Sequence, residues 1–246
     1  MKIIRKIACL ALAVFLAPIF PAEAVEAGYT VFHGDREQPR VALTVDDCYN
    51  IDHVQAVIDL CREYNVPVTF FVIGKALKVK DREVWQSALD AGCEIGNHTF
   101  SHARLPDLNR DGIISQLTRT QSRLDEVLGW HYAMQVMRPP YGRLSADPSH
   151  KSDLWVVEAI EDAGYVHAVR WDVSQTDPGK ALRDVQCGSI LLYHANPKDI
   201  RCLTRLIPNL VEAGYECVTV SELLSPAPAA DTAWLVTDEP APARAE

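Results

Sequence analysis

The sequence predicts an α/β fold in which a parallel sheet, closed into a barrel-like ring, is covered by helices. Apolar runs without polar alternation suit parallel strands that are buried on both faces. These runs alternate seven times with segments of helical periodicity across residues 40–224, which is typical of strand–helix units around a parallel sheet. Seven units suggest a barrel one unit short of the eight-fold form, with an open doubly wound sheet as the alternative. The length of 246 residues, 48% of them hydrophobic, suits one such domain.

The N-terminal half supplies the first three units. The first strand is a run of five apolar or β-favouring residues that leads directly into Asp46 and Asp47. Gly74 closes the second strand, and Gly92 stops the helix that follows it. The strands and helices of this half are expected, in order, over residues 41–47, 51–64, 67–73, 81–91 and 93–95.

The C-terminal half continues the alternation. Gly164 ends one helix, and Pro208 is expected to bend another. Strands are predicted over residues 134–137, 165–170, 189–193 and 215–220. Helices are predicted over residues 110–128, 153–163, 180–184 and 198–213, with a last short element at 221–224.

The first 24 residues resemble a secretory signal peptide. A basic start is followed by an apolar core at 7–20, too short for a typical membrane span, and by an Ala-x-Ala cleavage signal that ends at Ala24. We therefore expect an exported protein, periplasmic or extracellular, without a stable membrane anchor after cleavage. The remaining divisions are a linker at 25–39, the domain at 40–224 and a disordered Ala/Pro-rich tail at 225–246.

The charge balance excludes one class of partner. Cleavage removes three of the 24 basic residues and one of the 33 acidic residues. The mature protein then has 21 basic and 32 acidic residues, so its net charge is −11. Nucleic-acid binding needs clustered Lys and Arg, so no nucleic acid is expected. The same balance argues mildly against a strongly anionic polymer as substrate, although a local basic patch can override the total.

Six cysteines remain after cleavage, which permits disulfides in an exported protein but is too sparse for a cysteine scaffold. Buried free thiols and one or two bridges are both compatible with the pattern. No Cys-x-x-Cys pair indicates a zinc site. The six are Cys48, Cys61, Cys93, Cys187, Cys202 and Cys217.

Two strand ends carry residues that suit a metal. His98 and His102 lie four apart directly after the third strand, and neutral imidazole is a good zinc ligand. In a parallel barrel the strand ends converge on one mouth, where Asp46 and Asp47 also lie. One carboxylate and two histidines leave a coordination position open, as a catalytic site needs. The other carboxylate can then act as a base.

Two further strand ends carry candidate catalytic groups. Arg138 precedes two prolines that stiffen its loop, and an arginine there can keep a catalytic carboxylate ionised. His194 ends the sixth strand and is a candidate general acid.

These motifs together resemble the NodB-type polysaccharide deacetylases of carbohydrate esterase family 4, over about residues 40–224. Thr44-Val45-Asp46-Asp47 is similar to the family's T-F-D-D motif and His98-Thr99-Phe100-Ser101-His102 to its H-[ST]-x-x-H motif. Arg138-Pro139-Pro140-Tyr141-Gly142 matches R-P-P-Y-G, and Leu192-Tyr193-His194 matches L-x-H. The resemblance implies a distorted (β/α)7 barrel and metal-dependent removal of acetyl groups from an acetylated polysaccharide.

The resemblance also implies a role for each matched residue. Asp47, His98 and His102 would bind a divalent metal, for which Zn²⁺ is the expected ion, with cobalt, nickel or manganese as alternatives in vitro. Asp46 would be the base that activates water, and His194 would protonate the leaving amine. Arg138 would orient Asp46, the backbone N–H of Tyr141 would stabilise the oxyanion, and Leu192 would line the acetyl pocket.

The chain departs from the family pattern at two places. Cys48-Tyr49-Asn50 follows the paired aspartates where the family has Gly-Pro or a similar pair, and the larger side chains narrow the expected groove. In the fourth motif, D-x-x-D-W, Ser174 takes the place of the first Asp and Pro178 that of the Trp. That Asp supports the catalytic Arg or His in the family, and Asp172 or Asp177 is the candidate substitute here.

The leading hypothesis is an exported zinc-type hydrolase that deacetylates N-acetylglucosamine units of peptidoglycan or a chitin-like polymer. One alternative is an esterase that removes O-acetyl groups, as on xylan, because the same metal, base and acid serve either acyl transfer. The other is a weakly active or inactive carbohydrate-binding protein on the same fold, which the altered fourth motif would explain.

Overall fold

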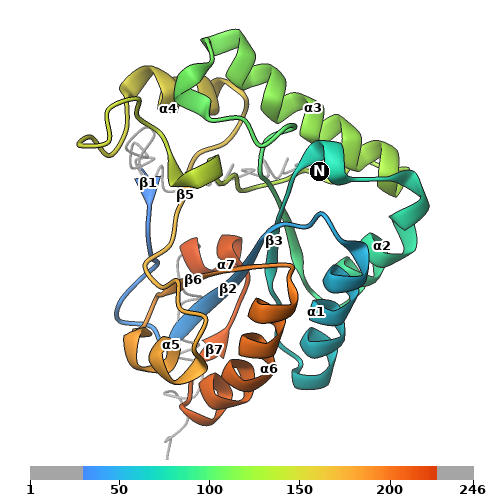
Figure 1. Cartoon of the computed structure of the whole chain (residues 1–246), viewed down its shortest axis with the longest axis vertical. Coiled ribbons are helices and arrows are strands. Elements are labelled where there is room, and N and C mark those ends of the chain that lie inside the picture. Colours follow the sequence, from blue (N-terminus) through green and yellow to red (C-terminus); the bar gives the residue numbers. More distant parts are fainter. Residues whose placement is uncertain (1–29, 226–246) are drawn as a thin grey trace, which may run out of the picture.

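The centre of the molecule is a five-stranded parallel sheet (Figure 1). The computed structural model describes residues 30–225, so the predicted signal peptide and nearly all of the predicted tail lie outside the described residues. The sheet order is β4 (Glu94–Asn97), β3 (Thr69–Val72), β2 (Arg40–Asp47) and β6 (Ile190–His194), and β7 (Glu216–Cys217) pairs with the start of β2. Every one of these pairings is parallel, as the unbroken apolar runs predicted.

Short bridges continue this sheet into a ring. Met137 bridges Asn97 of β4 on one side and Ala168 of β5 (Ala168–Val169) on the other, and Val173 bridges Leu191 of β6. The path therefore returns to β6 through the segment 168–173. This is an α/β fold consistent with the predicted distorted barrel, and the irregular part of the ring is where the bridges replace full strands.

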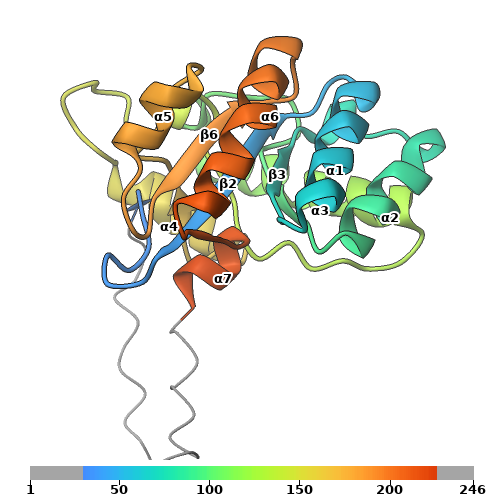
Figure 2. The ribbon, with the colours of Figure 1, turned by 90° about the horizontal axis from the view of Figure 1, so that it is seen from below.

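Helices surround the ring in chain order. Neighbours pack pairwise from α1 to α4, and α6 packs against both α5 and α1. Figure 2 shows α6 between α5 and α1. The bounds are α1 (Ile51–Tyr64), α2 (Arg82–Asp90), α3 (Arg110–Leu128), α4 (Leu154–Asp162), α5 (Pro178–Asp184), α6 (Pro197–Glu212) and α7 (Val220–Leu224). Four 3₁₀ turns complete the described chain, at Gly74–Ala76, Val79–Asp81, Leu105–Asp107 and Pro140–Gly142.

The helix boundaries follow local chemistry. The Asn50 side chain accepts from the N–H groups of Asp52 and His53 and so caps α1, and Asn65 ends that helix in the left-handed conformation. Asn196 caps α6 in the same way. Pro208 lies inside α6, where the sequence predicted it. The predicted helices are confirmed within a few residues at each end.

The alternation of side chains along β2 separates two regions of the core. Val41, Leu43 and Val45 belong to the large cluster between the sheet and the helices. Ala42 belongs to a second cluster inside the ring, which contains residues of several strands and is completed from α7 by Val220 and Leu223. Because successive strand side chains point to opposite faces, Thr44 and Asp46 continue the inner row toward the mouth. The same strand therefore builds the core and presents a carboxylate.

Three expectations about the elements need correction. The predicted strand at 134–137 is reduced to the bridges of Met137, and the strands at 165–170 and 215–220 are only two residues long. Their backbone departs from regular pairing where the barrel is distorted. The last predicted element is helical, as α7.

The predicted linker also differs from the structure over residues 30–39. β1 (Thr30–Val31) pairs with β5, and Val31 is buried. The N–H of Gly34 donates to the carbonyl of Gly188. Gly188 has a φ of +76°, and a Cβ atom added to it would lie 2.5 Å from the carbonyl oxygen of Asp35. This close approach, which only glycine permits, joins the segment to the domain.

The six cysteines are all described, and none forms a disulfide. Four are buried, which fits the free-thiol alternative that the sequence left open. Within residues 30–225, no helix combines the length and apolar character needed to cross a membrane.

Candidate active site

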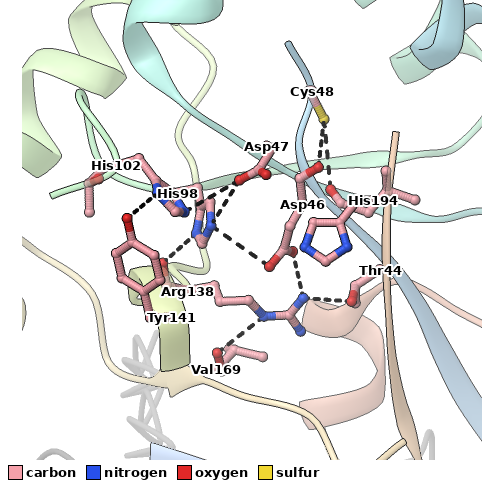
Figure 3. Close-up of polar contacts among 12 residues, drawn as sticks. Thr44, Asp46, Asp47, Cys48, His98, His102, Arg138, Tyr141, Val169 and His194 are labelled. Atoms are coloured by element: carbon pink, nitrogen blue, oxygen red, sulfur yellow. Dashed lines mark hydrogen bonds and ion pairs between the residues drawn. The ribbon is translucent and has the colours of Figure 1, made fainter. Parts of the chain in front are cut away.

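The carboxyl ends of the strands bring the predicted residues together. In the sheet register Asp46 lies opposite Phe71 of β3 and His194 of β6, and Asp47 lies opposite Val72. The pairing continues through β4 to Met137, so Arg138 emerges at the same edge. Figure 3 shows the side chains from these strand ends gathered around Asp46 and Asp47.

Asp47, His98 and His102 form a three-residue cluster whose ligand atoms lie within 4.8 Å of one another. The Oδ1 atom of Asp47 is 3.6 Å from Nε2 of His98 and 3.4 Å from Nε2 of His102. Donor atoms bound tetrahedrally to zinc at about 2.0–2.1 Å are separated by about 3.3 Å. The two separations from Asp47 are therefore close to those that a tetrahedral ion requires.

The Oδ1 atom of Asp47 supports the same interpretation. It is buried and has no hydrogen-bond partner in the described part of the chain, and a buried carboxylate oxygen without a partner is costly. A cation at the cluster would supply the missing interaction. The residues present therefore fit a divalent metal.

Hydrogen bonds orient both histidines toward this point. Nδ1 of His98 lies 2.8 Å from the carbonyl oxygen of Arg138. A carbonyl only accepts, so Nδ1 carries the hydrogen and Nε2 keeps its lone pair. Nδ1 of His102 lies 3.2 Å from the hydroxyl of Tyr141. Burial, together with the neighbouring His98, lowers the pKa of His102, which favours the neutral form that binds metal.

Asp46 faces the inside of the ring and binds Arg138. The guanidinium of Arg138 is completely buried, and its Nη1 donates to Oδ1 of Asp46 at 2.7 Å and to Thr44 at 2.6 Å. Its other nitrogens donate to the carbonyls of Val169 and Arg170. Burial lowers the pKa of Arg138, and the charge of Asp46 opposes that effect. Arg138 thus provides a rigid cationic support for the Asp46 carboxylate.

His194 lies on the opposite side of Asp46 from His98 (Figure 3), and Asp199 holds it in place. The buried carboxylate of Asp199 accepts from the backbone N–H of His194 at 2.8 Å and lies 3.4 Å from its Nδ1. This hydrogen bond raises the pKa of His194, against the opposing effect of burial. Burial would raise the pKa of Asp199, but the hydrogen bonds from His194 and Asn196 outweigh it and the pKa falls. The imidazolium form of His194 is therefore stabilised, as the role expected of it as a general acid requires.

Tyr141 and Leu192 complete the site. The Tyr141 side chain is 64% exposed, and its ring centroid lies 4.6 Å from that of His102. Leu192 is buried on β6, two residues before His194. The site is therefore bordered by one exposed aromatic ring and one buried apolar side chain.

The backbone at the site is unusual. Six non-glycine residues of the described chain have positive φ, and five of them lie at this mouth: Asp47, Cys48, Thr99, His102 and Tyr141. Such conformations cost energy and persist only where the surroundings impose them. Their concentration at the strand ends marks this edge of the barrel as the functional one.

A family model described as polysaccharide deacetylase matches residues 33–165, more than half of the chain. The chain belongs to the polysaccharide deacetylase family. It is a metal-dependent hydrolase of that family, acts on an acetylated polysaccharide and carries the Asp–His–His cluster described above.

Curated and solved relatives agree with this assignment. A peptidoglycan-N-acetylglucosamine deacetylase of Bacillus cereus is 27% identical over 215 residues, which cover 82% of this chain and 74% of the relative. The crystal structure of the Bc1960 peptidoglycan N-acetylglucosamine deacetylase is 26% identical with a TM-score of 0.68, covering 83% of this chain and 97% of that one.

A third structure shares the fold. The family 4 pseudoenzyme BA3943 from Bacillus anthracis has a TM-score of 0.70 at 23% identity, covering 81% of this chain and 70% of that one. At this identity the likeness concerns the architecture.

In the deacetylase domain the two candidate substitutes for the fourth motif form hydrogen bonds with other partners. Asp172 accepts from Arg36, Ser189 and the N–H of Ile190. Asp177 caps α5 by accepting from the N–H of Lys180. In the described chain neither carboxylate has a hydrogen bond with Arg138 or His194, because each already satisfies backbone or arginine donors elsewhere.

Sequence reasoning missed three supporting residues. Asp199 supports His194. The signal for this role in the sequence was that Asp199 lies only five residues after His194. Gln116 of α3 accepts from the N–H groups of Phe100 and Ser101 and so holds the turn between the two histidines. Asn97 accepts from the N–H of Thr99. Gln116 lies in an ordinary amphipathic helix, so no sequence pattern singled it out.

Proposed function

We propose that this deacetylase uses zinc to remove the acetyl group from N-acetylglucosamine units of peptidoglycan. The observation that carries the proposal is the arrangement of Asp46 between the Asp47–His98–His102 cluster and His194. A carboxylate held by Arg138 and an imidazole held by Asp199 are a base and an acid at one mouth. The names of the Bacillus cereus relative and of the Bc1960 structure support peptidoglycan as the polymer.

The roles follow from the position of each side chain. Asp47, His98 and His102 would hold a divalent cation, which would supply a Lewis acid for the acetyl carbonyl and for the attacking water. Asp46 takes a proton from the water whose oxygen attacks the carbonyl carbon. The backbone N–H of Tyr141 donates to the oxygen that becomes negative in the tetrahedral intermediate.

The acid half completes the reaction. His194, protonated and oriented by Asp199, gives its proton to the sugar nitrogen as the carbon–nitrogen bond breaks. The products are acetate and a free amine on the sugar. Leu192 lines the space for the acetyl methyl group, and Arg138 keeps Asp46 aimed at the water.

Zinc is the ion we propose because three nitrogen and oxygen donors at tetrahedral separations suit it. We also propose that the protein is exported, since residues 1–24 have the pattern of a signal peptide. N-terminal sequencing of the mature protein from its own cells tests the export proposal, and an intact Met1 would contradict it.

The test of function is acetate release by purified protein from peptidoglycan, from N-acetylglucosamine oligomers and from O-acetylated xylan. Each substrate is tried as isolated, after chelation and after zinc is restored. We expect zinc-dependent release from peptidoglycan. Release from xylan alone would support the O-acetyl esterase, and no release with one ion bound per chain would support the carbohydrate-binding alternative.

A further inference from the structure

A basic pocket lies between α5 and α6, beside the acid half of the active site. It has a volume of about 440 Å³. Three cationic side chains and two threonine hydroxyls line it, and none of its lining residues within the described chain is acidic. The lining residues are Thr176, Pro178, Lys198, Arg201, Cys202, Thr204 and Arg205.

The three cations form a row on one face of α6. Lys198, Arg201 and Arg205 are spaced by three and four residues, which places them above one another along the helix. All three are exposed. Among residues 30–225 none of them has a carboxylate partner within ion-pair distance, whereas Arg36 and Arg110 do. The row therefore presents uncompensated positive charge to solvent.

This charge is a local exception. The whole chain has a net charge of −9, so three cations without partners around one cavity are not the general character of its surface. The N-terminal end of α6 adds a partial positive charge to the same place. Two carboxylates act on Cys202 of the pocket wall, but Asp177 is engaged in capping α5, and Asp199 is buried and accepts from the N–H of His194. The pocket is consequently suited to an anion.

The pocket is connected to the catalytic groups through α6. Lys198 and Asp199 are adjacent, and the Asp199 carboxylate holds His194. From Lys198 to Arg205 the row extends about 10 Å along the helix, at 1.5 Å per residue. Cys202 on the pocket wall donates weakly to the carbonyl of Gln175, which joins α6 to the loop before α5. Since α6 begins directly after the carboxyl end of β6, its first turns and the pocket beside them lie on the mouth side of the barrel.

We propose that this pocket binds a carboxylate of the polysaccharide, carried near the acetylated sugar that is hydrolysed. The inference rests on the proposed function and narrows the substrate to acid-bearing glycans, in preference to neutral N-acetylglucosamine polymers. A guanidinium pair recognises a carboxylate by charge-assisted hydrogen bonds, and the threonine hydroxyls can add to them. The negative total charge of the chain argued against an anionic polymer, and this pocket reverses that argument locally.

The test compares two forms of one substrate. Peptidoglycan glycan strands are supplied with their carboxylates free or converted to amides, and kcat and KM for acetate release are measured by the zinc-loaded full chain. The variant is Arg201→Gln with Arg205→Gln. We expect the wild type to prefer the free carboxylates, and the variant to raise KM for them about fivefold with kcat unchanged, because exposed charge pairs are individually modest.

A matched variant removes two charges elsewhere. Lys78→Gln with Lys80→Gln lies at the 3₁₀ turn before α2, where both side chains are exposed and neither has an ion pair within residues 30–225, and it should leave the preference intact. Equal KM for free and amidated strands in the wild type, or the same loss on both strands in the pocket variant, would overturn the proposal. Calorimetry of the binding of both strands to the Asp46→Asn protein tests the carboxylate pocket separately from the proposed deacetylase function. Binding that prefers the free carboxylate without any turnover by the wild type would sink the proposed function and keep the pocket.

Discussion

The two halves of the proposed active site, the base half around Asp46 and the acid half around His194, are built differently. On the base side, Asp46 is held by Arg138. Arg138 belongs to the Arg-Pro-Pro-Tyr-Gly motif, which follows the fourth predicted strand as the family pattern leads one to expect. On the acid side, the fourth motif has Ser174 in the expected position of its carboxylate, and His194 is held by Asp199 of α6 instead. Each support stabilises the charged form of its partner, Arg138 that of Asp46 and Asp199 that of His194. Only Arg138 lies where the motif pattern places a support.

The difference teaches that a supporting role depends on where a side chain ends up in space. Arg138 is completely buried, makes four hydrogen bonds and lies over the ring of Phe71 at 4.2 Å. Few other positions could supply that geometry. Nδ1 of His194, in contrast, needs only one acceptor at a half-exposed edge, and α6 begins directly beside it. We infer that the acid half tolerates a relocated support more readily than the base half.

The largest effect is expected for the carboxylate at the centre of the comparison. Asp46→Asn removes the base while preserving the shape of the side chain, so kcat should fall by about 10²–10⁴-fold. Zinc content, measured by atomic emission, should stay near one ion per chain because Asp46 is not in the ligand cluster. Near-normal turnover by this variant would contradict the mechanism.

The support of the base half should be important for stability. Arg138→Met leaves Asp46 buried without its partner, and breaking a buried pair costs about 3–5 kcal/mol. We expect a loss of that size in the free energy of unfolding, measured by urea denaturation of the metal-free protein. Arg123→Gln on α3 serves as the control, because its partly exposed ion pair with Glu126 should contribute only about 0.5 kcal/mol. A small loss for Arg138→Met would show that the two halves are equally tolerant.

The support of the acid half should affect the pH profile instead. The pKa of His194 is raised by Asp199, so the protonated acid persists to higher pH and activity is lost as pH rises through that pKa. Asp199→Asn can still accept the backbone N–H of His194 but removes the charge. We expect about tenfold lower kcat and a basic limb displaced toward lower pH, measured as kcat against pH. An unmoved limb would remove Asp199 from this role.

The smallest effect is expected at the edge of the metal cluster. Tyr141→Phe keeps the ring against His102 but removes the hydroxyl 3.2 Å from its Nδ1. Loss of a partner behind a ligand weakens metal binding by about tenfold or more in buried sites, and Tyr141 is exposed, so about threefold is expected here. Zinc competition with a chromophoric chelator measures it. An affinity lowered as much as by His102→Ala would place Tyr141 among the ligands.

Much of this molecule followed from the sequence alone. Most of the parallel strands, the helices and their alternation depend on local apolar periodicity, which each segment carries by itself. The motif residues Asp46, Asp47, His98, His102, Arg138 and His194 could be nominated because strand ends in a parallel barrel converge on one mouth.

Tertiary structure alone decided the rest. The segment 30–39 has weak periodicity, and it is joined to the domain by the pairing of β1 with β5 and by the close approach of its backbone to Gly188. Asp172 and Asp177 stood beside the altered motif in the sequence, but their carboxylates are engaged by Arg36 and by the start of α5. Asp199 and the row of cations on α6 became meaningful only when that helix was placed against β6 and α5. Which carboxylate faces which imidazole depends on distances in space, and these are determined by packing between elements far apart in the chain.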